Sequence, residues 1–499
     1  MKNFTIDRFA YDLICDASPQ DTAVSFEQNG DTLSVFITSD SGRPQFVLLK
    51  WPFATDEELF VLGDAWERSY GDLRFTKLSQ NSRPMPWYFA ATDQTQTYCF
   101  GVKTQPNAFV CLTYDAGGIT ARIDCRNGGG GVNLAGRTVK LCTFVFEHYD
   151  LPPYAALCAY CRTLCDHPLL PREKIYGGND WYCAYGKSAR ADIVQDAKLQ
   201  AQLSAGISNR PFMVVDDGWE IDGFLGPYEP NEKFGDMKAL ADEIRSLGVR
   251  PGIWARLLDN QSPCITDDMR ILRGGKRIYL DPTNADVQSL LRSWIAKIRS
   301  WGYELLKHDF STYDLFGDFG GELTDSITNY TGWHFADETK TNAEIALDFY
   351  RLIREACGDM LILGCNTVSH LCAGLVHINR TGDDTSGREW ERTRKMGVNT
   401  LAFRLAQNRA FYIVDADCVG ILDDNIPWEK NRQWLDVLSK SDTALFVSCA
   451  VLNDEQRADL KRAYLEIQKD HDIRPLDIYE NLTPREWSID ASAVTYNWD

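Results

Sequence analysis

Several features that would place a chain in a special class are missing from this sequence of 499 residues. The opening stretch, MKNFTIDRFAYDLICDASPQ, lacks the apolar core and small-residue cleavage site of a signal peptide. No window approaches about 18 apolar residues without charges, so we expect no membrane span. Basic residues are outnumbered, with 52 Lys and Arg against 71 Asp and Glu and a formal net charge of −19. Such a chain would repel phosphate backbones, which argues against nucleic acid or another polyanion as a partner and favours a neutral substrate.

The cysteine pattern indicates thiols rather than disulfides. The 15 cysteines are odd in number and scattered along the chain, which predicts reduced thiols and a cytoplasmic location. Cys158, Cys161 and Cys165 in CAYCRTLC lie on one face of a predicted helix, but no second CxxC pair completes a tetrahedral set. We expect buried free thiols there, with a metal site as the less favoured alternative.

The pattern of the first part of the chain predicts antiparallel sheet. Short alternating stretches such as TLSVFITSD, QFVLLKW and TVKLCTFVFEH, separated by turns, predict a β-sandwich over residues 1–150. The NGGGG run at 127–131 lies between such stretches without a following helix or GKS/GKT sequence. A flexible hairpin turn is therefore favoured over a phosphate loop. Residues 151–174 are predicted to form a linker helix.

From Tyr176 onward the pattern changes. Short apolar strands such as PFMVVDDGW, RPGIWARL and YELLKHDF alternate with amphipathic helices such as ARADIVQDAKLQAQLSA. The number and size of these strand-then-helix units match a (β/α)8 TIM barrel, which we predict for residues 175–451. Residues 452–499 are predicted to be a short C-terminal appendage. The fold class is thus α/β, with the barrel preceded by an antiparallel β-sandwich.

Carboxylates stand at the carboxyl ends of several predicted strands: Asp216 and Asp217, Asp309, Asp383 and Asp384, Asp415 and Asp417. A barrel directs such residues toward one pocket. Crowded carboxylates repel one another, so a fold avoids them unless they bind something. Indole rings at Trp181, Trp219 and Trp254 add flat apolar faces. Carboxylates and indoles in one pocket favour a sugar, whose hydroxyls need acceptors and whose C–H face stacks on rings.

Structural roles compete with this interpretation. Lys307 and Asp309 share a strand face and could form a plain ion pair, while Asp216, Asp217 or the DDTSG segment could cap helices. Asp415 and Asp417 could equally be structural. A Mg²⁺ site is disfavoured by a cation beside each carboxylate, Lys307 with Asp309 and Arg380 with Asp384. A Schiff base on Lys307 ranks lower still, because the neighbouring aspartate keeps the lysine charged.

Four motifs resemble the retaining α-galactosidases of glycoside hydrolase family 36: DDGW at 216–219, PGIW at 251–254, KHDF at 307–310 and RTGDDT at 380–385. They fall in the expected order across the whole predicted barrel. The resemblance implies that Asp309 is the nucleophile and Asp384 the acid/base, with Asp383 as the fallback. It also implies a galactose site made of Asp216, Asp217, Trp254, Lys307, Cys365, Arg380 and Trp181. No cofactor and no metal are implied, and a homo-oligomer is possible in such a family.

The resemblance also predicts how the two carboxyl groups are tuned. Lys307 is expected to keep Asp309 ionised, and Asp383 is expected to raise the pKa of Asp384 so that it holds a proton. Two departures leave alternatives open. The strand-five stretch GCNTVSHLCAGL lacks the C-x-x-G-G-G sequence of many members, so an α-N-acetylgalactosaminidase is an alternative. The usual C-terminal β domain is shortened or missing. Two other functions stay open: a raffinose-synthase-like α-galactosyltransferase and a non-catalytic sugar-binding barrel.

Overall fold

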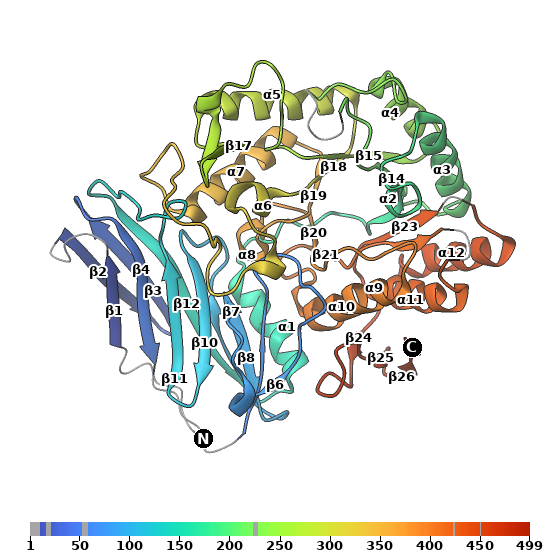
Figure 1. The fold of residues 1–499 in the computed structure, drawn as a ribbon. Helices are drawn as coiled ribbons and strands as arrows, with labels where there is room; N and C mark the ends of the chain where they lie inside the picture. The colour runs from blue at the N-terminus through green and yellow to red at the C-terminus, as the bar shows by residue number, and fades with distance from the viewer. Residues whose placement is uncertain (1–9, 16–20, 52–57, 223–227, 423–424, 450) are drawn as a thin grey trace.

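The computed structural model describes residues 10–15, 21–51, 58–222, 228–422, 425–449 and 451–499. Antiparallel sheets form one side of the molecule, and a parallel sheet surrounded by helices forms the other (Figure 1). Most of the opening stretch in which a signal peptide was sought, residues 1–9 and 16–20, lies outside the described residues. Within the described ranges, no helix has the length and apolar character needed to cross a bilayer.

Two antiparallel sheets make up the N-terminal region, with strand orders β1-β4-β11-β10-β7 and β2-β3-β12-β9-β8-β5-β6. Trp51 packs edge-to-face on Phe100 and on Phe144 of the other sheet, with centroids 5.1 Å apart in each pair. The apolar faces of the two sheets therefore meet, and the predicted antiparallel region is confirmed. The strands are β1 Ala10–Cys15, β2 Thr22–Asn29, β3 Thr32–Ser39, β4 Pro44–Trp51, β5 Phe60–Gly63, β6 Thr76–Lys77, β7 Met85–Pro86, β8 Tyr88–Thr92, β9 Thr97–Val102, β10 Phe109–Asp115, β11 Gly118–Asp124 and β12 Thr138–Tyr149.

The NGGGG run forms a turn, as expected, but a tightly packed one. Asn127 and Gly130 pair as an isolated bridge. A Cβ atom on Gly129 would lie 2.1 Å from the carbonyl oxygen of Tyr330, so only glycine permits this approach. The expectation of a flexible turn is wrong, because the loop around Tyr330 lies directly against it.

The second half of the chain forms a parallel sheet in the order β21-β20-β19-β18-β15-β14-β13-β23-β22. Its two end strands are separated in sequence only by residues 416–418, so the sheet curls round on itself. The N–H of Ala444 donates to the carbonyl of Val414 at 2.9 Å, which brings β21 beside the start of β23. The curled parallel sheet is confirmed, and a fully closed (β/α)8 barrel stays a prediction. The strands are β13 Tyr176–Asn179, β14 Phe212–Val215, β15 Arg250–Ala255, β18 Leu305–His308, β19 Leu361–Gly364, β20 Ile378–Arg380, β21 Ile413–Asp415, β22 Val419–Ile421 and β23 Leu445–Cys449.

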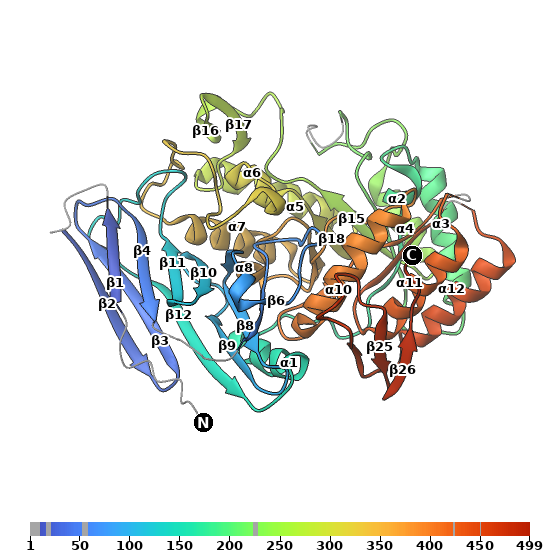
Figure 2. The same cartoon turned by 60° about the horizontal axis from the view of Figure 1, so that its bottom comes forward.

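Helices cover the outside of this sheet (Figures 1 and 2). Helix α5 shows why they form: its buried side chains recur at helical spacing, and the Asn284 side chain caps its first N–H groups. It ends at Gly302, which has a φ of 89°. The helices are α1 Pro153–Leu164, α2 Trp181–Ala184, α3 Arg190–Leu203, α4 Met237–Ser246, α5 Ala285–Trp301, α6 Ser311–Phe316, α7 Asn342–Cys357, α8 Ser369–Cys372, α9 Trp390–Arg392, α10 Asn399–Arg404, α11 Trp428–Lys440 and α12 Asp454–Glu466.

Two smaller sheets complete the fold. Strands β16 (Arg270–Arg273) and β17 (Lys276–Leu280) form a hairpin after β15, and β24 (Ile473–Pro475), β25 (Glu486–Ile489) and β26 (Ser492–Thr495) form an antiparallel sheet near the C-terminus. Helix α12 packs against α11 and α3. We therefore propose that the barrel unit, predicted to end at 451, continues through α12.

Helix α1 carries the cysteine cluster. Cys161 and Cys165 are buried, and burial raises the pKa of each thiol. Among the described residues, no group of three or more His, Cys, Asp or Glu side chains is arranged to hold a metal ion. Cys161 in α1 and Cys165, directly after its last residue, are thus buried thiols.

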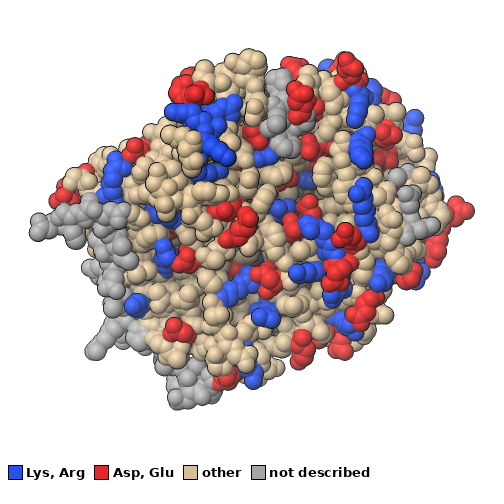
Figure 3. Space-filling view, in the orientation of Figure 1, with Lys and Arg blue, Asp and Glu red and all other residues tan. Residues whose placement is uncertain are grey.

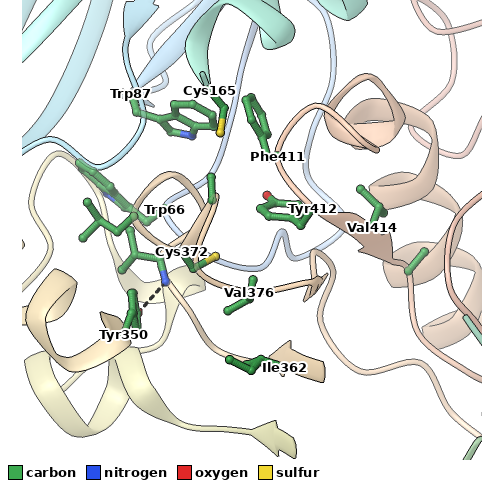
Figure 4. Packing of buried hydrophobic residues seen from close by; sticks show 14 of the residues in the cluster. Trp66, Trp87, Cys165, Tyr350, Ile362, Cys372, Val376, Phe411, Tyr412 and Val414 are labelled. Atoms are coloured by element: carbon green, nitrogen blue, oxygen red, sulfur yellow. Dashed lines mark hydrogen bonds between the residues drawn. The ribbon is translucent and has the colours of Figure 1, made fainter. Parts of the chain in front are cut away.

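A segment of the N-terminal region crosses onto the carboxyl end of the parallel sheet. We call residues 64–70, between β5 and β6, the crossing segment. Ser69 pairs with Gly382 as an isolated bridge, and its N–H donates to the carbonyl of Thr381 at 2.8 Å. Trp66 of this segment and Trp87 lie in one buried cluster with Phe411 and other residues of the second half (Figure 4). The two halves therefore share a core at this point.

Arg404 anchors the crossing segment. It is fully buried, donates from Nε to Asp64 Oδ1 at 2.6 Å, and donates from Nη1 to the carbonyl of Glu67 at 2.6 Å. Its Nη2 reaches the carbonyl of Ala65 at 3.1 Å. A buried guanidinium placed on a buried carboxylate and two carbonyls fixes where this segment lies.

We predict that Arg404→Ala lowers the free energy of unfolding by about 3–5 kcal/mol, because Asp64 would be left as an unpaired buried charge. Chemical denaturation measures the change. The matched control is Arg409→Ala, because the Arg409 side chain is 49% exposed in its pair with Asp442. This variant should change the free energy of unfolding by no more than about 1 kcal/mol. Equal losses in the two variants would contradict the anchoring role.

Candidate active site

A cavity of about 210 Å³ lies at the carboxyl ends of the parallel strands. Its lining combines four carboxylates, two cations, an amide and aromatic rings: Asp216, Asp217, Asp309, Asp384, Arg68, Lys307, Asn366, Trp181, Tyr182, Trp254, Phe310 and Phe319. A larger depression of about 530 Å³ lies between α11, α12 and β26, where charged side chains such as Arg432 and Lys440 line it. The smaller cavity holds the convergent acidic groups and is the candidate site.

Asp216 is a buried residue of the cavity lining that accepts several hydrogen bonds. It is 3% exposed and accepts hydrogen bonds from Lys307 Nζ at 2.7 Å and Asn179 Nδ2 at 2.6 Å, both at Oδ2. Its Oδ1 accepts from the N–H of Asp217 at 2.9 Å. Burial lowers the pKa of Lys307, but Asp216 and nearby anionic groups outweigh it and hold that pKa well above its usual value. The lysine is therefore a fixed cation.

Lys307 forms its salt bridge with Asp216, whereas the alternative of a plain ion pair named Asp309 as its partner. Strand β15 lies between β14 and β18, and the register places Trp254 opposite Lys307. The long lysine side chain reaches across β15 to the end of β14, where Asp216 is more deeply buried. The shared strand face correctly placed Lys307 and Asp309 in one cavity, but it did not identify the partner.

Asp217 lies in the same lining of the cavity and has an oxygen without a hydrogen-bond partner among the described residues. Among the described residues, its Oδ1 is buried without a hydrogen-bond partner. Burial, followed by the charges of Asp216 and Asp309, raises its pKa to about 6. A buried acceptor without a partner is costly to the fold. It therefore offers a strong acceptor for a ligand hydroxyl.

Asp309 is presented by a sharp turn at the end of β18. Phe310 has a φ of 61°, a left-handed conformation that is rare for a phenylalanine, and α6 follows at once. The N–H of Phe310 donates to Asp309 Oδ1 at 2.7 Å, and Trp254 Nε1 donates to Oδ2 at 3.2 Å. Donors on both oxygens fix the carboxylate against the cavity.

Asp384 is held by arginines from both halves of the molecule. Its Oδ1 accepts from Arg380 Nη2 at 2.9 Å and from Arg68 Nη1 at 3.2 Å, and its side chain is 38% exposed. Burial would raise the pKa of Asp384, but Arg380, then Arg68, then Lys307 outweigh burial and hold it below the usual value. The expectation of a raised pKa is wrong for the free protein.

Asp383 turns away from this group. Its Oδ2 accepts from Arg392 Nη2 at 2.7 Å, and Arg68 Nη2 lies 3.4 Å from its Oδ1. Arg392 and Arg68 thus offset its charge, and the pKa of Asp384 is lowered instead of raised as expected. The cavity lining among the described residues includes Asp384 and not Asp383.

Other predicted residues lie around the cavity at different depths. Trp181 and Trp254 line it, whereas Cys365 and Arg380 are buried and are not among the lining residues. Arg380 also donates to Asp417 Oδ2 at 2.6 Å, and the N–H of Thr385 donates to the same oxygen at 2.7 Å. Asp417 therefore positions Arg380, which agrees with the alternative that Asp417 has a structural role.

Sequence reasoning missed several lining residues: Arg68, Tyr182, Phe310, Phe319 and Asn366. Phe310 and Asn366 directly follow the predicted Asp309 and Cys365, so the strand ends could have indicated them. Arg68 belongs to the DAWERSY stretch of the antiparallel region. No local pattern there signals contact with a residue more than three hundred positions away.

No protein-family model and no curated protein matches the chain. Among solved structures, the alpha-galactosidase TtGalA from Thermus thermophilus, in complex with p-nitrophenyl alpha-D-galactopyranoside, has a TM-score of 0.63 at 18% identity, covering 95% of this chain and 99% of that one. A variant of the family 36 alpha-galactosidase AgaA from Geobacillus stearothermophilus, with 1-deoxygalactonojirimycin, has a TM-score of 0.63 at 15% identity, covering 96% and 73%. The galactosidase domain of the alpha-galactosidase-sucrose kinase AgaSK gives 0.59 at 16%, covering 91% and 68%. The chain therefore shares the fold of these proteins.

We predict that Asp217→Asn stabilises the free protein above pH 6. A pKa raised to about 6 favours the protonated folded form, so the stability that Asp217 contributes is full below about pH 4 and is lost as pH rises through 6. The variant should gain about 2–3 kcal/mol at pH 8 and nothing at pH 4. Urea denaturation at both pH values checks this, and an equal change at both would contradict it.

Proposed function

We propose that the chain is a retaining exo-α-galactosidase that releases terminal α-linked galactose from short neutral oligosaccharides or glycosides. The observation that carries this proposal is the cavity itself. Asp309 and Asp384, the two carboxylates required for a double displacement, both line it and come from different strands. The shared fold with solved α-galactosidases supports the same assignment.

The cavity suits one sugar ring. Its volume of about 210 Å³ is below the ~300–1,000 Å³ of sites for drug-sized ligands. Asp216 and Asp217 offer acceptors for hydroxyls, and Lys307 offers N–H donors. Trp181 and Trp254 offer ring faces for the apolar side of the sugar. Acidic and basic side chains are interspersed over the surface in Figure 3, which fits a neutral substrate.

The proposed reaction has two steps. Asp309 bonds to the anomeric carbon while the bond from that carbon to the leaving oxygen breaks, and Asp384 gives that oxygen its proton. Water then attacks the same carbon, its proton passes to Asp384, and the bond to Asp309 breaks. Two inversions return the original configuration. Asp309 is proposed as nucleophile and Asp384 as acid/base, with substrate binding by Asp216, Asp217, Lys307, Trp181 and Trp254, and with Cys365 and Arg380 supporting the pocket from behind. Neither a cofactor nor a metal takes part in this scheme.

The first test is hydrolysis of p-nitrophenyl α-galactoside and of the corresponding α-N-acetylgalactosaminide. We expect release from the galactoside, α-galactose as the first product by NMR, and a loss of at least about 10³-fold in Asp309→Ala. Cleavage of the acetamido sugar alone would assign the alternative specificity. Transfer to an added sugar in place of hydrolysis would assign a galactosyltransferase. β-Galactose as first product, or full activity in Asp309→Ala, would contradict the mechanism.

The pH dependence provides a second test. The first step needs protonated Asp384, so kcat/KM falls as pH rises above the pKa of that residue in the free enzyme. Because the arginines lower this pKa, we expect an acidic optimum for substrates with poor leaving groups, such as an α-galactosyl disaccharide. Arg68→Met removes one cation, so the alkaline limb should move to higher pH.

Arg83→Met is the matched control, since Arg83 belongs to the same region and pairs with Asp72 at 3.0 Å. Its pH profile should coincide with that of the wild type. An alkaline limb that stays in place in Arg68→Met would contradict the assignment of Asp384 as the acid.

A further inference from the structure

Glu67 is a fully buried carboxylate of the crossing segment, and its bonds extend toward the cavity. Its Oε1 accepts from the N–H of Gly320 at 2.7 Å and from the hydroxyl of Tyr70 at 2.9 Å. The amide Nδ2 of Asn366 lies 3.1 Å from both carboxylate oxygens. One side chain of the antiparallel region thus binds two loops of the parallel sheet.

Both of these loops carry cavity-lining residues. Gly320 directly follows Phe319, which lies beyond α6, and Asn366 lies just beyond β19. Phe319 and Asn366 both line the cavity. Asn366 adopts a left-handed backbone with a φ of 53°, so its conformation depends on its surroundings. Glu67 is the group that these two parts of the wall share.

The fit around Glu67 is close. A Cβ atom on Gly320 would lie 2.3 Å from Glu67 Cγ, so the loop packs directly on the side chain. Burial, despite the neighbouring Arg68, raises the pKa of Glu67. A buried carboxyl group is costly unless donors satisfy it, and here the donors Tyr70, Gly320 and Asn366 belong to the crossing segment and the two wall loops.

Anchoring the crossing segment does not require this side chain. Arg404 holds the backbone carbonyls of Ala65 and Glu67, and Trp66 Nε1 donates to the carbonyl of Thr324 at 3.0 Å. The carboxylate of Glu67 points instead to Gly320 and Asn366. Apart from the bond from Tyr70 within the segment, these hydrogen bonds therefore join Glu67 to the loops of the cavity wall.

We propose that Glu67 is a positioning residue, which sets the places of Phe319 and Asn366 in the sugar-binding wall. What the wall binds rests on the proposed function. A wall residue contacts the substrate both before and during reaction, so its displacement weakens binding more than it slows the bond-breaking step.

The kinetic test uses Glu67→Ala and Glu67→Gln with p-nitrophenyl α-galactoside. We expect KM to rise about tenfold in Glu67→Ala, with kcat changed less than about threefold and the pH profile unmoved. Glu67→Gln keeps one acceptor for Gly320, so its KM should lie between those of Glu67→Ala and the wild type. Glu67→Gln also keeps the test possible if Glu67→Ala does not fold. The control is Glu58→Ala, an exposed acid of the same region whose bonds are to Ser79.

A double-mutant cycle shows whether Glu67 acts through the wall. In an Asn366→Ala background, Glu67→Ala should raise KM by clearly less than it does in the wild type, because one of the two positioned groups is already gone. Effects that multiply fully, or a KM that stays unchanged in Glu67→Ala, would overturn the proposal.

Hydrogen exchange gives a readout that needs no substrate. The peptide containing Gly320 should exchange faster in Glu67→Ala, while the peptide containing Arg404 keeps its protection. If the wild type cleaves no galactoside, the proposed function fails, and this measurement still decides whether Glu67 holds the loop. Unchanged exchange at Gly320 would overturn the positioning role in either case.

Discussion

The carboxylates of Asp216, Asp217, Asp309 and Asp384 line one small cavity, and their mutual repulsion has to be met by cations built into the same walls. Lys307, two strands away, forms an ion pair with Asp216, and Arg380 and Arg68 form ion pairs with Asp384. Asp217 is left with a raised pKa and with a buried oxygen that has no hydrogen-bond partner among the described residues. The cations thus offset much of the repulsion among the carboxylates, and the free oxygen of Asp217 stays available as an acceptor for a ligand hydroxyl.

These cations do not come from the parallel sheet alone. Arg68 lies in the crossing segment, which Arg404 holds against the second half of the molecule. The adjacent Glu67 contacts two further loops of the cavity wall. The antiparallel region is consequently part of the site. In this account its packing against the parallel sheet has a chemical consequence, because a shift of the segment would change both the charge around Asp384 and the shape of the wall.

Much of this arrangement could be predicted from the sequence, because carboxyl ends of parallel strands meet at one edge of a sheet. That rule placed Asp216, Asp217, Asp309 and Asp384 together and added Trp181 and Trp254. Contacts that depend on side-chain reach or on long-range packing could not be predicted. Alternation along β18 assigned Lys307 to Asp309, whereas the side chain reaches Asp216 two strands away. The contribution of residues 64–70 has no local signal, since it follows from how the antiparallel region packs against the parallel sheet.

The most direct test of the account is whether galactose becomes covalently attached to Asp309. The protein would be incubated with an α-galactoside that has a good leaving group and a fluorinated sugar, which slows hydrolysis of a covalent species. The peptides of the protein would then be analysed by mass spectrometry. The account predicts one sugar residue on the peptide that contains KHDF, and none in Asp309→Ala. A sugar attached to another carboxylate, or turnover of the substrate with no covalent species at any time, would contradict the central claim.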